Sequence, residues 1–356
     1  MSAILFFDPS CRHPYDSRTL QQQATGGTEA SVTRIADALG AYVMQHNRAE
    51  VSGAYLPLSR IAGIEHVVVL RDSRALAVMR RLYPQARYYL WLHDQVNPGS
   101  KRGRRLGSTA RLLRELSVTV ICVSNTQRYA VEATLRRIGV GEHIKALTIY
   151  NPVDDTLAPD GSAIDHRKLV FFSSPNKGLA YTLDVFSALR RRMPDLTLTV
   201  GNPAYKLGNL TGINGVKYLG PQPQQRIHTE VRSALCTFSP NFVLPETFGL
   251  VYAESKALGT PVLAHDCGAA AEVIGDPQQV LPVTSGYRAY ETAVHRLPLS
   301  WRRGPARLAD RCGLFDAYAE RIRAWRAGGR PRVSPDPRFR TALVAEQWRA
   351  LLASST

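Results

Sequence analysis

Short apolar runs alternate with helical patterns along this 356-residue chain. In the first half, the apolar runs predict strands at Ala3–Asp8, His66–Leu70, Arg87–His93, Val118–Ser124 and Lys145–Tyr150. Apolar residues at helical spacing between these runs predict helices at Thr28–Leu39, Ser73–Leu82, Thr109–Leu116 and Asn125–Ile138. Because strands that alternate with helices form parallel sheets covered on both faces, the first half predicts one doubly wound α/β unit.

The alternation stops at residues 151–162, where proline, glycine and acidic residues cluster without periodicity. It resumes with predicted strands at Lys168–Ser173, Leu196–Val200 and Leu235–Ser239 and predicted helices at Leu179–Arg191 and Pro223–Ala234. We therefore expect two doubly wound units, at residues 1–152 and 153–335, with a cleft between them and a helical tail at 336–356. Ligands of such sheets bind beyond the carboxyl ends of the strands.

The composition is that of a globular protein, with 44% hydrophobic and 21% charged residues. The five cysteines are widely spaced and form no Cys-x-x-Cys pair, so the sequence predicts neither a disulfide framework nor a zinc site. The opening segment Met1–Asp8 lacks the basic start of a signal peptide, and no apolar run is long enough to span a bilayer. We therefore expect a cytoplasmic protein, either soluble or attached to the inner membrane face only at its surface.

The formal net charge of +16 favours anionic partners such as phosphates, anionic lipids or nucleic acid. Basic residues concentrate in two stretches, residues 101–114 and 302–332. The first stretch also contains Leu106, Leu112 and Leu113, so a surface helix there would suit anionic lipid headgroups. A solvated basic face explains the stretch equally well. The sequence has no zinc finger, recognition helix or aromatic-basic RNA motif, so specific nucleic-acid binding is not expected.

Two glutamates, Glu246 and Glu254, lie eight residues apart in a segment with a helical pattern. In a continuous helix starting near Thr247 they would be roughly 12 Å apart along the axis, which is about the span of a nucleotide-sugar. The N–H groups at the start of that helix would lie between the two carboxylates and favour a pyrophosphate. The alternative is structural: Glu246 complements a helix dipole, and Glu254 pairs with a basic residue in the core.

The residues that follow favour the ligand-binding interpretation. Gly259–Ala264 predicts a turn and a buried strand, and Gly268–Val273 predicts a small-residue turn into another helix. This order and spacing resemble the retaining family-4 glycosyltransferases, whose donor site carries Glu-x7-Glu, then a Gly-x-Pro-Val strand and a small-residue turn ending in Glu. The resemblance implies an α/β fold of the GT-B type, with two Rossmann-like domains, an acceptor-side first domain, a nucleotide-sugar site in the second, and a C-terminal helix that crosses back onto the first.

The resemblance also assigns roles in the first domain. Gly26 and Gly27, at the predicted start of a helix, correspond to a Gly-Gly turn that faces the donor phosphates or the acceptor. An ordinary turn explains the same pair without a ligand. His93 ends a buried strand, where family members often have a histidine that contacts the donor sugar; a satisfied core histidine is the alternative.

In the second domain, Lys177 lies in the predicted loop Ser173–Gly178 and would place an ammonium on the donor phosphates. The family usually has Gly-Arg earlier in this loop, and here Ser173 or Ser174 stands in place of the arginine. One phosphate clamp is therefore missing, unless an arginine such as Arg18 replaces it. A plain loop lysine is the alternative interpretation.

The implied reaction transfers a sugar from a nucleotide diphosphate to a glycan, glycolipid or other hydroxyl acceptor, with retention at the anomeric carbon. Glu246 would hold sugar hydroxyls, and Glu254 would hold the ribose. The groups expected to stabilise the leaving diphosphate are the Lys177 ammonium and the amides of Phe248, Gly249 and Leu250. The sequence contains no Asp-x-Asp triplet, so a divalent metal is not expected, and the resemblance implies no cofactor.

Other classes stay open. A catalytically degenerate relative would act as a binding module, given the missing arginine, and a sugar-nucleotide epimerase shares the fold. A phosphorylase-like enzyme would need a lysine-bound pyridoxal phosphate. The sugar, base and acceptor depend on the loops after Pro9, after His93 and around Asn202–Tyr205, which the sequence alone does not resolve.

Overall fold

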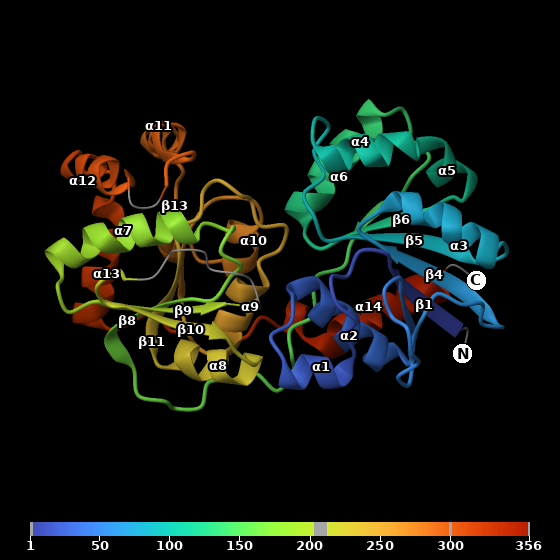
Figure 1. Ribbon diagram of the computed structural model, residues 1–356, viewed down its shortest axis with the longest axis horizontal. Helices are drawn as coiled ribbons and strands as arrows, with labels where there is room; N and C mark the ends of the chain where they lie inside the picture. The colour runs from blue at the N-terminus through green and yellow to red at the C-terminus, as the bar shows by residue number, and fades with distance from the viewer. Residues whose placement is uncertain (1–2, 203–211, 299–300, 355–356) are drawn as a thin grey trace. The chain divides into compact units, whose positions relative to one another are not determined.

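The structure is a computed structural model that describes residues 3–202, 212–298 and 301–354. The chain divides into two compact units (Figure 1). The first unit contains the chain up to residue 20, residues 27–155 and the chain from residue 337; the second contains residues 21–26 and 156–336. Residues 203–205 of the predicted specificity loop lie outside the described residues.

The first unit is built on a parallel sheet of seven strands in the order β3-β2-β1-β4-β5-β6-β7. Its strands are β1 (Ala3–Asp8), β2 (Tyr42–Gln45), β3 (Tyr55–Leu56), β4 (Ile64–Leu70), β5 (Arg87–Leu92), β6 (Thr119–Cys122) and β7 (Ala146–Thr148). The helices along this part of the chain are α1 (Ser17–Gln22), α2 (Gly27–Leu39), η1 (Ser73–Ala75), α3 (Leu76–Leu82), α4 (Lys101–Ser108), α5 (Ala110–Glu115) and α6 (Asn125–Arg137). The central strands β4 and β5 are buried along most of their length, as expected for a sheet covered on both faces.

The second unit is built on a parallel sheet of six strands in the order β10-β9-β8-β11-β12-β13. Its strands are β8 (Asp165–Phe171), β9 (Thr197–Asn202), β10 (Val216–Pro221), β11 (Ala234–Ser239), β12 (Val262–His265) and β13 (Val280–Leu281). Its helices are α7 (Leu179–Arg192), α8 (Gln224–Arg232), α9 (Leu250–Ala257), α10 (Ala270–Ile274), η2 (Pro277–Gln279), α11 (Ser285–Val294), α12 (Arg303–Arg311) and α13 (Asp316–Gly328). Among the described helices of both units, none is long and apolar enough to cross a membrane.

The predicted α/β class with two parallel sheets is confirmed, but the hydrophobic pattern missed four strands. Strands β2, β3 and β13 are only four, two and two residues long, which is too short for a periodic signal. Strand β10 is an edge strand whose residues are mostly half-buried, so it lacks a continuous apolar run.

The end of the chain completes the core of the first unit through η4 (Pro337–Phe339) and α14 (Thr341–Ala353). The ring of Trp348 lies 5.7 Å from that of Phe6 and 5.0 Å from that of Trp91, between ring centroids. The N–H of Val153 donates to the carbonyl oxygen of Phe339 at 2.6 Å. The last helix is therefore part of the packing of this unit.

Candidate functional site

Three neighbouring strands of the second unit, β8, β11 and β12, end at the same edge of the sheet. The loop after β8 contains Ser173–Gly178, the loop after β11 runs to Gly249, and the turn after β12 contains Asp266–Gly268. In parallel sheets, this edge is where ligands bind. The residues Lys177 and Glu246, which the sequence singled out, lie on the first two of these loops.

Lys177 and Glu246 form an ion pair, with 2.7 Å between Lys177 Nζ and Glu246 Oε2. The Glu246 side chain is 6% exposed, whereas the Lys177 side chain is 45% exposed. A buried carboxylate is costly without a cation, so the pair satisfies Glu246 while the lysine stays accessible to solvent. The arrangement offers one cation and one carboxylate to a polar ligand at the strand ends.

The loops after β8 and β11 contact each other closely where the backbone of Gly178 meets the side chain of Asn241. Gly178 has a φ of +95°, and a Cβ at this position would lie 2.8 Å from the Cβ of Asn241. Glycine is the residue that combines a left-handed backbone with so close a neighbour. Asn241 Oδ1 in turn accepts the N–H of Val243 at 3.1 Å, so the asparagine shapes its own loop as well as the contact between the two.

Helix α9 begins at Leu250, later than the sequence predicted. Gly249 precedes it with a φ of +89°, a left-handed conformation that stops the helix from extending back to Thr247. The prediction of one continuous helix between Glu246 and Glu254 is therefore wrong. The N–H groups of the first turn of α9 nevertheless follow the Glu246 segment directly, and such groups lack partners within their own helix.

The Glu246 segment is extended and pairs with the turn after β12. A β-bridge links Glu246 to Gly268, and the carbonyl oxygen of Glu246 accepts the N–H of Ala269 at 2.9 Å. Gly268 has a φ of +68°, and a Cβ there would overlap the Glu246 carbonyl oxygen. The small-residue turn that the sequence predicted thus fixes the backbone from which Glu246 projects.

Glu254 lies on α9 and is buried, with 6% of its surface exposed. The neighbouring hydroxyl of Ser255 lies 2.7 Å from that of Thr237 on β11 and 2.9 Å from the carbonyl oxygen of Thr260. These contacts fix α9 against the sheet, so the direction of Glu254 is set by the fold. A buried acid in this position suits a hydroxyl-bearing ligand.

The negative charge of Glu246 also acts on Cys267, in the turn after β12. Burial, and then Glu246, raise the pKa of Cys267 to about 11. The thiol is therefore protonated at neutral pH and is not a nucleophile at this site.

The first unit has its own group of polar residues at strand ends. Strands β1, β4 and β5 are adjacent, and Asp8, Arg71 and His93 lie at or directly after their carboxyl ends. Arg71 Nη2 lies 3.0 Å from Glu29 Oε1, on the first turn of α2. The strand ends of this unit are therefore charged as well.

Arg71 has a φ of +60°, which is uncommon for a residue with a side chain. Its N–H donates to the carbonyl oxygen of Trp91 at 2.9 Å, while its guanidinium pairs with Glu29. Such a conformation costs free energy and is found mainly at functional sites. Arg71 is not among the residues that the sequence pattern singles out, although its position directly after the predicted strand His66–Leu70 is a usable signal.

His93 is buried, and its ring lies 4.5 Å from that of Trp91, between centroids. Burial, and then the positive charge of Arg71, lower the pKa of His93 well below its usual range. The imidazole is therefore neutral at pH 7 and can form hydrogen bonds without carrying charge. The next residue, Asp94, pairs with Arg102 of the basic stretch at 2.7 Å.

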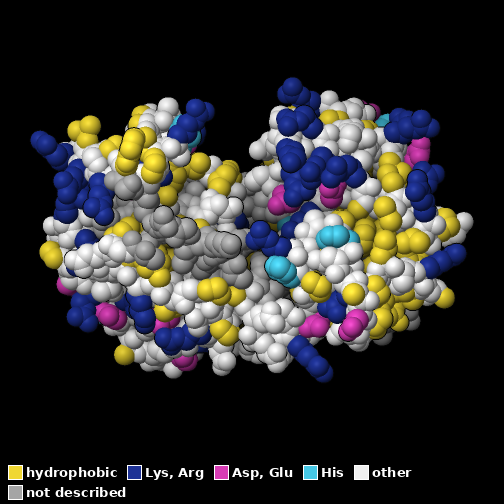
Figure 2. Space-filling view, in the orientation of Figure 1, with side chains coloured by type: hydrophobic (Ala, Val, Ile, Leu, Met, Phe, Trp, Pro, Cys, Tyr) yellow, Lys and Arg dark blue, Asp and Glu magenta, His cyan; other side chains and the backbone are white. Residues whose placement is uncertain are grey.

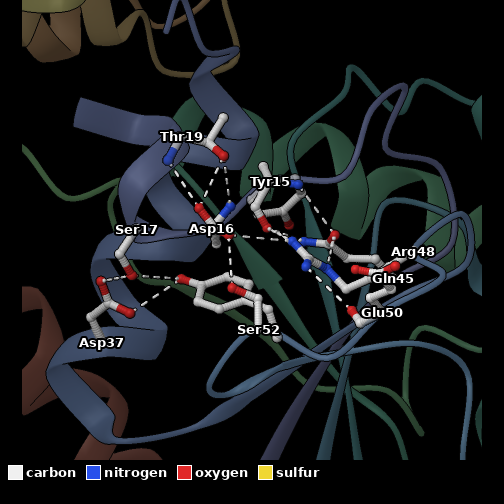
Figure 3. Close-up of polar contacts among 10 residues, drawn as sticks. Tyr15, Asp16, Ser17, Thr19, Asp37, Gln45, Arg48, Glu50 and Ser52 are labelled. Atoms are coloured by element: carbon white, nitrogen blue, oxygen red, sulfur yellow. Dashed lines mark hydrogen bonds and ion pairs between the residues drawn. The ribbon is translucent and has the colours of Figure 1, made fainter. Parts of the chain in front are cut away.

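The loop after β1 is held by a network of polar contacts (Figure 3). Gln45 accepts the N–H of Tyr15 at 3.2 Å and donates to its carbonyl oxygen at 2.8 Å. Arg48 Nη2 donates to the same carbonyl oxygen at 2.9 Å. Asp16 accepts the N–H of Thr19 at 2.9 Å, in the manner of a helix cap. These contacts preorganise the loop after β1.

The other predicted residues lie at helix starts. Gly27 begins α2, and Gly26 directly precedes it. Phe248 is buried, and Leu250 is the first residue of α9. Within the described residues, no group of three or more His, Cys, Asp or Glu side chains is arranged to hold a metal ion.

Residues 163–297 match the family model of the group 1 glycosyl transferases. The chain is 40% identical over 78 residues to D-inositol 3-phosphate glycosyltransferase of Nocardia farcinica, which is 22% of this chain and 16% of that protein. It is 29% identical over 154 residues to phosphatidyl-myo-inositol mannosyltransferase of Mycolicibacterium smegmatis, or 39% of each protein. The chain thus matches well under half the length of either relative.

Solved structures resemble the chain over its whole length. HepE of Anabaena in complex with UDP-glucose has a TM-score of 0.63 at 18% identity, covering 99% of both chains. Sucrose-phosphate synthase from Thermosynechococcus elongatus has a TM-score of 0.58 at 17% identity, covering 99% of this chain and 100% of that one. At such identities the likeness shows a shared fold. The chain therefore has the GT-B fold, and its residues 163–297 are similar to the group 1 glycosyl transferases.

Proposed function

We propose that this protein is a retaining, metal-independent glycosyltransferase that moves a sugar from a nucleotide diphosphate to a hydroxyl group of a glycan, glycolipid or other acceptor. The observation that carries the proposal is the Lys177–Glu246 pair at the strand ends, beside the start of α9. The family match includes this pair. The complex of HepE with UDP-glucose supports a nucleotide-sugar as donor.

In this proposal the diphosphate lies between the Lys177 ammonium and the amides of Phe248, Gly249 and Leu250. A lysine that is 45% exposed can contact phosphate oxygens as a point charge, and the start of a helix favours an anion. When the bond to the sugar breaks, negative charge grows on the diphosphate. These groups therefore stabilise the transition state more than the bound substrate.

The two carboxylates have separate roles in the proposal. Glu246, oriented by Lys177, accepts hydrogen bonds from the sugar hydroxyls, and Glu254 accepts them from the ribose. The acceptor oxygen forms its bond to the anomeric carbon on the face that the diphosphate leaves. Because attack and departure occur on the same face, the configuration at the anomeric carbon is retained. The acceptor proton passes to the departing phosphate oxygen.

Three further roles in the proposal come from the resemblance. His93 of the first unit is assigned to the donor sugar as a neutral hydrogen-bonding group, which its lowered pKa supports. Gly26 and Gly27 are assigned to the donor phosphates or the acceptor, because backbone without side chains allows close approach.

The missing arginine favours a second candidate, a relative that binds the donor but transfers nothing. Ser173 or Ser174 stands in the place of that arginine, so Lys177 is the one charged side chain of residues 173–178. With one positive charge fewer at the donor phosphates, the transition state is stabilised less, while the donor can still bind. Turnover, rather than binding, separates the two candidates.

The first experiment is a thermal-shift panel of UDP-, GDP-, ADP- and dTDP-sugars without added metal. We expect one nucleotide series to raise the melting temperature, since a ligand at a hundred times its Kd adds about 2.7 kcal/mol. The shift should vanish in Glu254→Gln. It should persist in Glu320→Gln, a matched change at an exposed position of α13. No shift with any donor, in folded protein, contradicts a donor site.

The second experiment follows product formation with the donor so identified, in the presence of EDTA. Transfer to added acceptors, with the product's anomeric configuration read by NMR, tests metal independence and retention separately. Donor binding without turnover across an acceptor panel would favour the binding module. Inversion, or loss of activity in EDTA that a metal restores, would overturn the corresponding part of the proposal.

A further inference from the structure

Helices α11, α12 and α13 of the second unit enclose an apolar groove of about 570 Å³. Its lining includes Leu281, Tyr287, Tyr290, Pro305, Leu308 and Leu314. The donor-site residues described above are absent from this lining, so the groove is distinct from the proposed transfer site.

The inner face of α12 is fixed by ion pairs, of which the one between Arg302 and Asp184 is buried on both sides. Asp310 accepts hydrogen bonds from Arg191 at 2.7 Å and from Arg192 at 2.6 Å. Arg302, directly before the helix, is 4% exposed and lies 2.7 Å from Asp184. Because breaking a buried pair is strongly destabilising, these contacts determine which face of α12 turns outward.

The outward face of α12 and the residues just before it combine large apolar side chains with arginines. Trp301, two residues before the helix, is 71% exposed, and Leu308 on the helix is 63% exposed. Arg303, Arg307 and Arg311 are exposed at intervals of four residues, so they form one stripe along the helix. Within the described part of the chain, none of these three guanidiniums pairs with a carboxylate.

Figure 2 shows hydrophobic side chains on the surface over α11 and α12, with Lys and Arg side chains beside them. An apolar surface next to unpaired cations suits a partner that is apolar in one layer and anionic in the next. A bilayer that contains anionic phospholipid has that order, with phosphates above the acyl chains. A nucleic acid would match the arginines but not the exposed tryptophan and leucine beside the groove.

The other basic stretch of the chain lacks this combination. In α4 and α5, Leu106 and Leu113 are 3% and 0% exposed, because they pack into the core of the first unit. Arg102 and Arg105 there pair with Asp94 and Asp72. The segment at residues 101–114, where the sequence predicted a lipid-facing helix, therefore exposes basic side chains, whereas its Leu106 and Leu113 are buried.

We propose that the outer face of α12, with the adjoining groove, docks on the surface of a bilayer containing anionic phospholipid. Trp301 and Leu308 enter the boundary between headgroups and acyl chains, and Arg303, Arg307 and Arg311 contact lipid phosphates. Exposed aromatic and aliphatic side chains on a basic helix bind membranes in this way. The proposal is independent of whether the protein transfers a sugar.

Vesicle cosedimentation with the full-length protein tests the charge requirement. We expect binding to phosphatidylcholine vesicles that contain phosphatidylglycerol, and little binding to pure phosphatidylcholine. Changing Arg303, Arg307 and Arg311 to Gln should weaken binding about a hundredfold at physiological salt. The matched control changes the exposed Lys101, Arg104 and Arg114 to Gln, which removes the same charge from α4 and α5. If both triple variants lost vesicle binding equally, net charge alone would account for the binding, and the proposal would be overturned.

Tryptophan fluorescence tests the apolar contact in the unmodified protein. Of the four tryptophans, Trp91, Trp325 and Trp348 are buried and Trp301 is exposed. Insertion should shift the emission to the blue and make it quenchable by brominated acyl chains, and Trp301→Phe should abolish both effects. Trp301→Ser combined with Leu308→Ser should weaken binding about tenfold. Vesicle binding without any change at Trp301 would contradict insertion.

Discussion

At the scale of single residues, Arg71 combines a strained backbone with a specific ion pair, and two substitutions separate the two contributions. Arg71→Gly and Arg71→Ala both remove the contact with Glu29. Alanine keeps a left-handed conformation that costs about 1 kcal/mol, whereas glycine adopts it readily. We therefore expect Arg71→Gly to be more stable than Arg71→Ala by about 1 kcal/mol in urea denaturation. Equal stability would mean that φ at this position is not left-handed.

Lys177 is the residue whose charge matters most to the proposed chemistry. Lys177→Met should lower kcat/KM by about a hundredfold, because hydrogen bonds to charged groups contribute roughly 1.5–3 kcal/mol. Lys217→Met is a suitable control, since Lys217 is also a lysine of the second unit that pairs with a glutamate, but it is exposed and lies on β10. The melting temperature of each variant must be measured as well, because Glu246 becomes a buried carboxylate without this cation. A loss of stability with unchanged kcat/KM would leave Lys177 a structural role only.

At the scale of elements, the turn after β12 holds the Glu246 segment, and a single methyl group tests this. Gly268→Ala adds a Cβ that overlaps the Glu246 carbonyl oxygen and imposes a positive φ on alanine. We expect a loss of about 2 kcal/mol in stability together with weaker donor binding. Gly304→Ala, in the first turn of α12 with no atom within 4 Å of the added Cβ, should instead stabilise by about 0.4–1 kcal/mol. Thermal unfolding of the two variants measures both changes in stability, which should have opposite signs.

Elements with a strong local pattern could be predicted from the sequence, whereas those set by distant contacts could not. The apolar run Ala3–Asp8 predicts β1 to the residue. The start of α9 depends on the left-handed Gly249 and on the bridge from Glu246 to Gly268, neither of which spacing reveals. The ion pair of Lys177 with Glu246 joins residues 69 positions apart, so local periodicity carries no trace of it.

At the scale of the whole molecule, the basic residues behind the net charge of +16 do not all have the same structural role. Many arginines complete buried or half-buried pairs, as Arg191 and Arg192 do with Asp310, and these contribute to the packing of the unit. The stripe on α12 has no such role, which is why we assign it to a partner outside the chain. Salt screens exposed charges over about 10 Å at 0.1 M, so salt should weaken the vesicle contact more than the fold.

Stability of the whole protein should also depend on pH through a buried histidine. His265 is fully buried, and burial lowers its pKa to about 4. In the unfolded chain its pKa is about 6.5, so between these values the unfolded state binds more protons. Its contribution to stability is therefore complete above about pH 6.5 and is lost as the pH falls toward 4. The full loss corresponds to about 3 kcal/mol.

Urea denaturation at a series of pH values measures this contribution when variants are compared. His265→Phe keeps an aromatic ring beside Tyr287, whose ring centroid lies 4.3 Å away, but cannot titrate. We expect its unfolding free energy to fall by about 3 kcal/mol less than that of the unchanged protein over this window. The difference between the two pH dependences isolates His265 from the carboxylates that protonate at the acid end of the window, because those groups are common to both proteins.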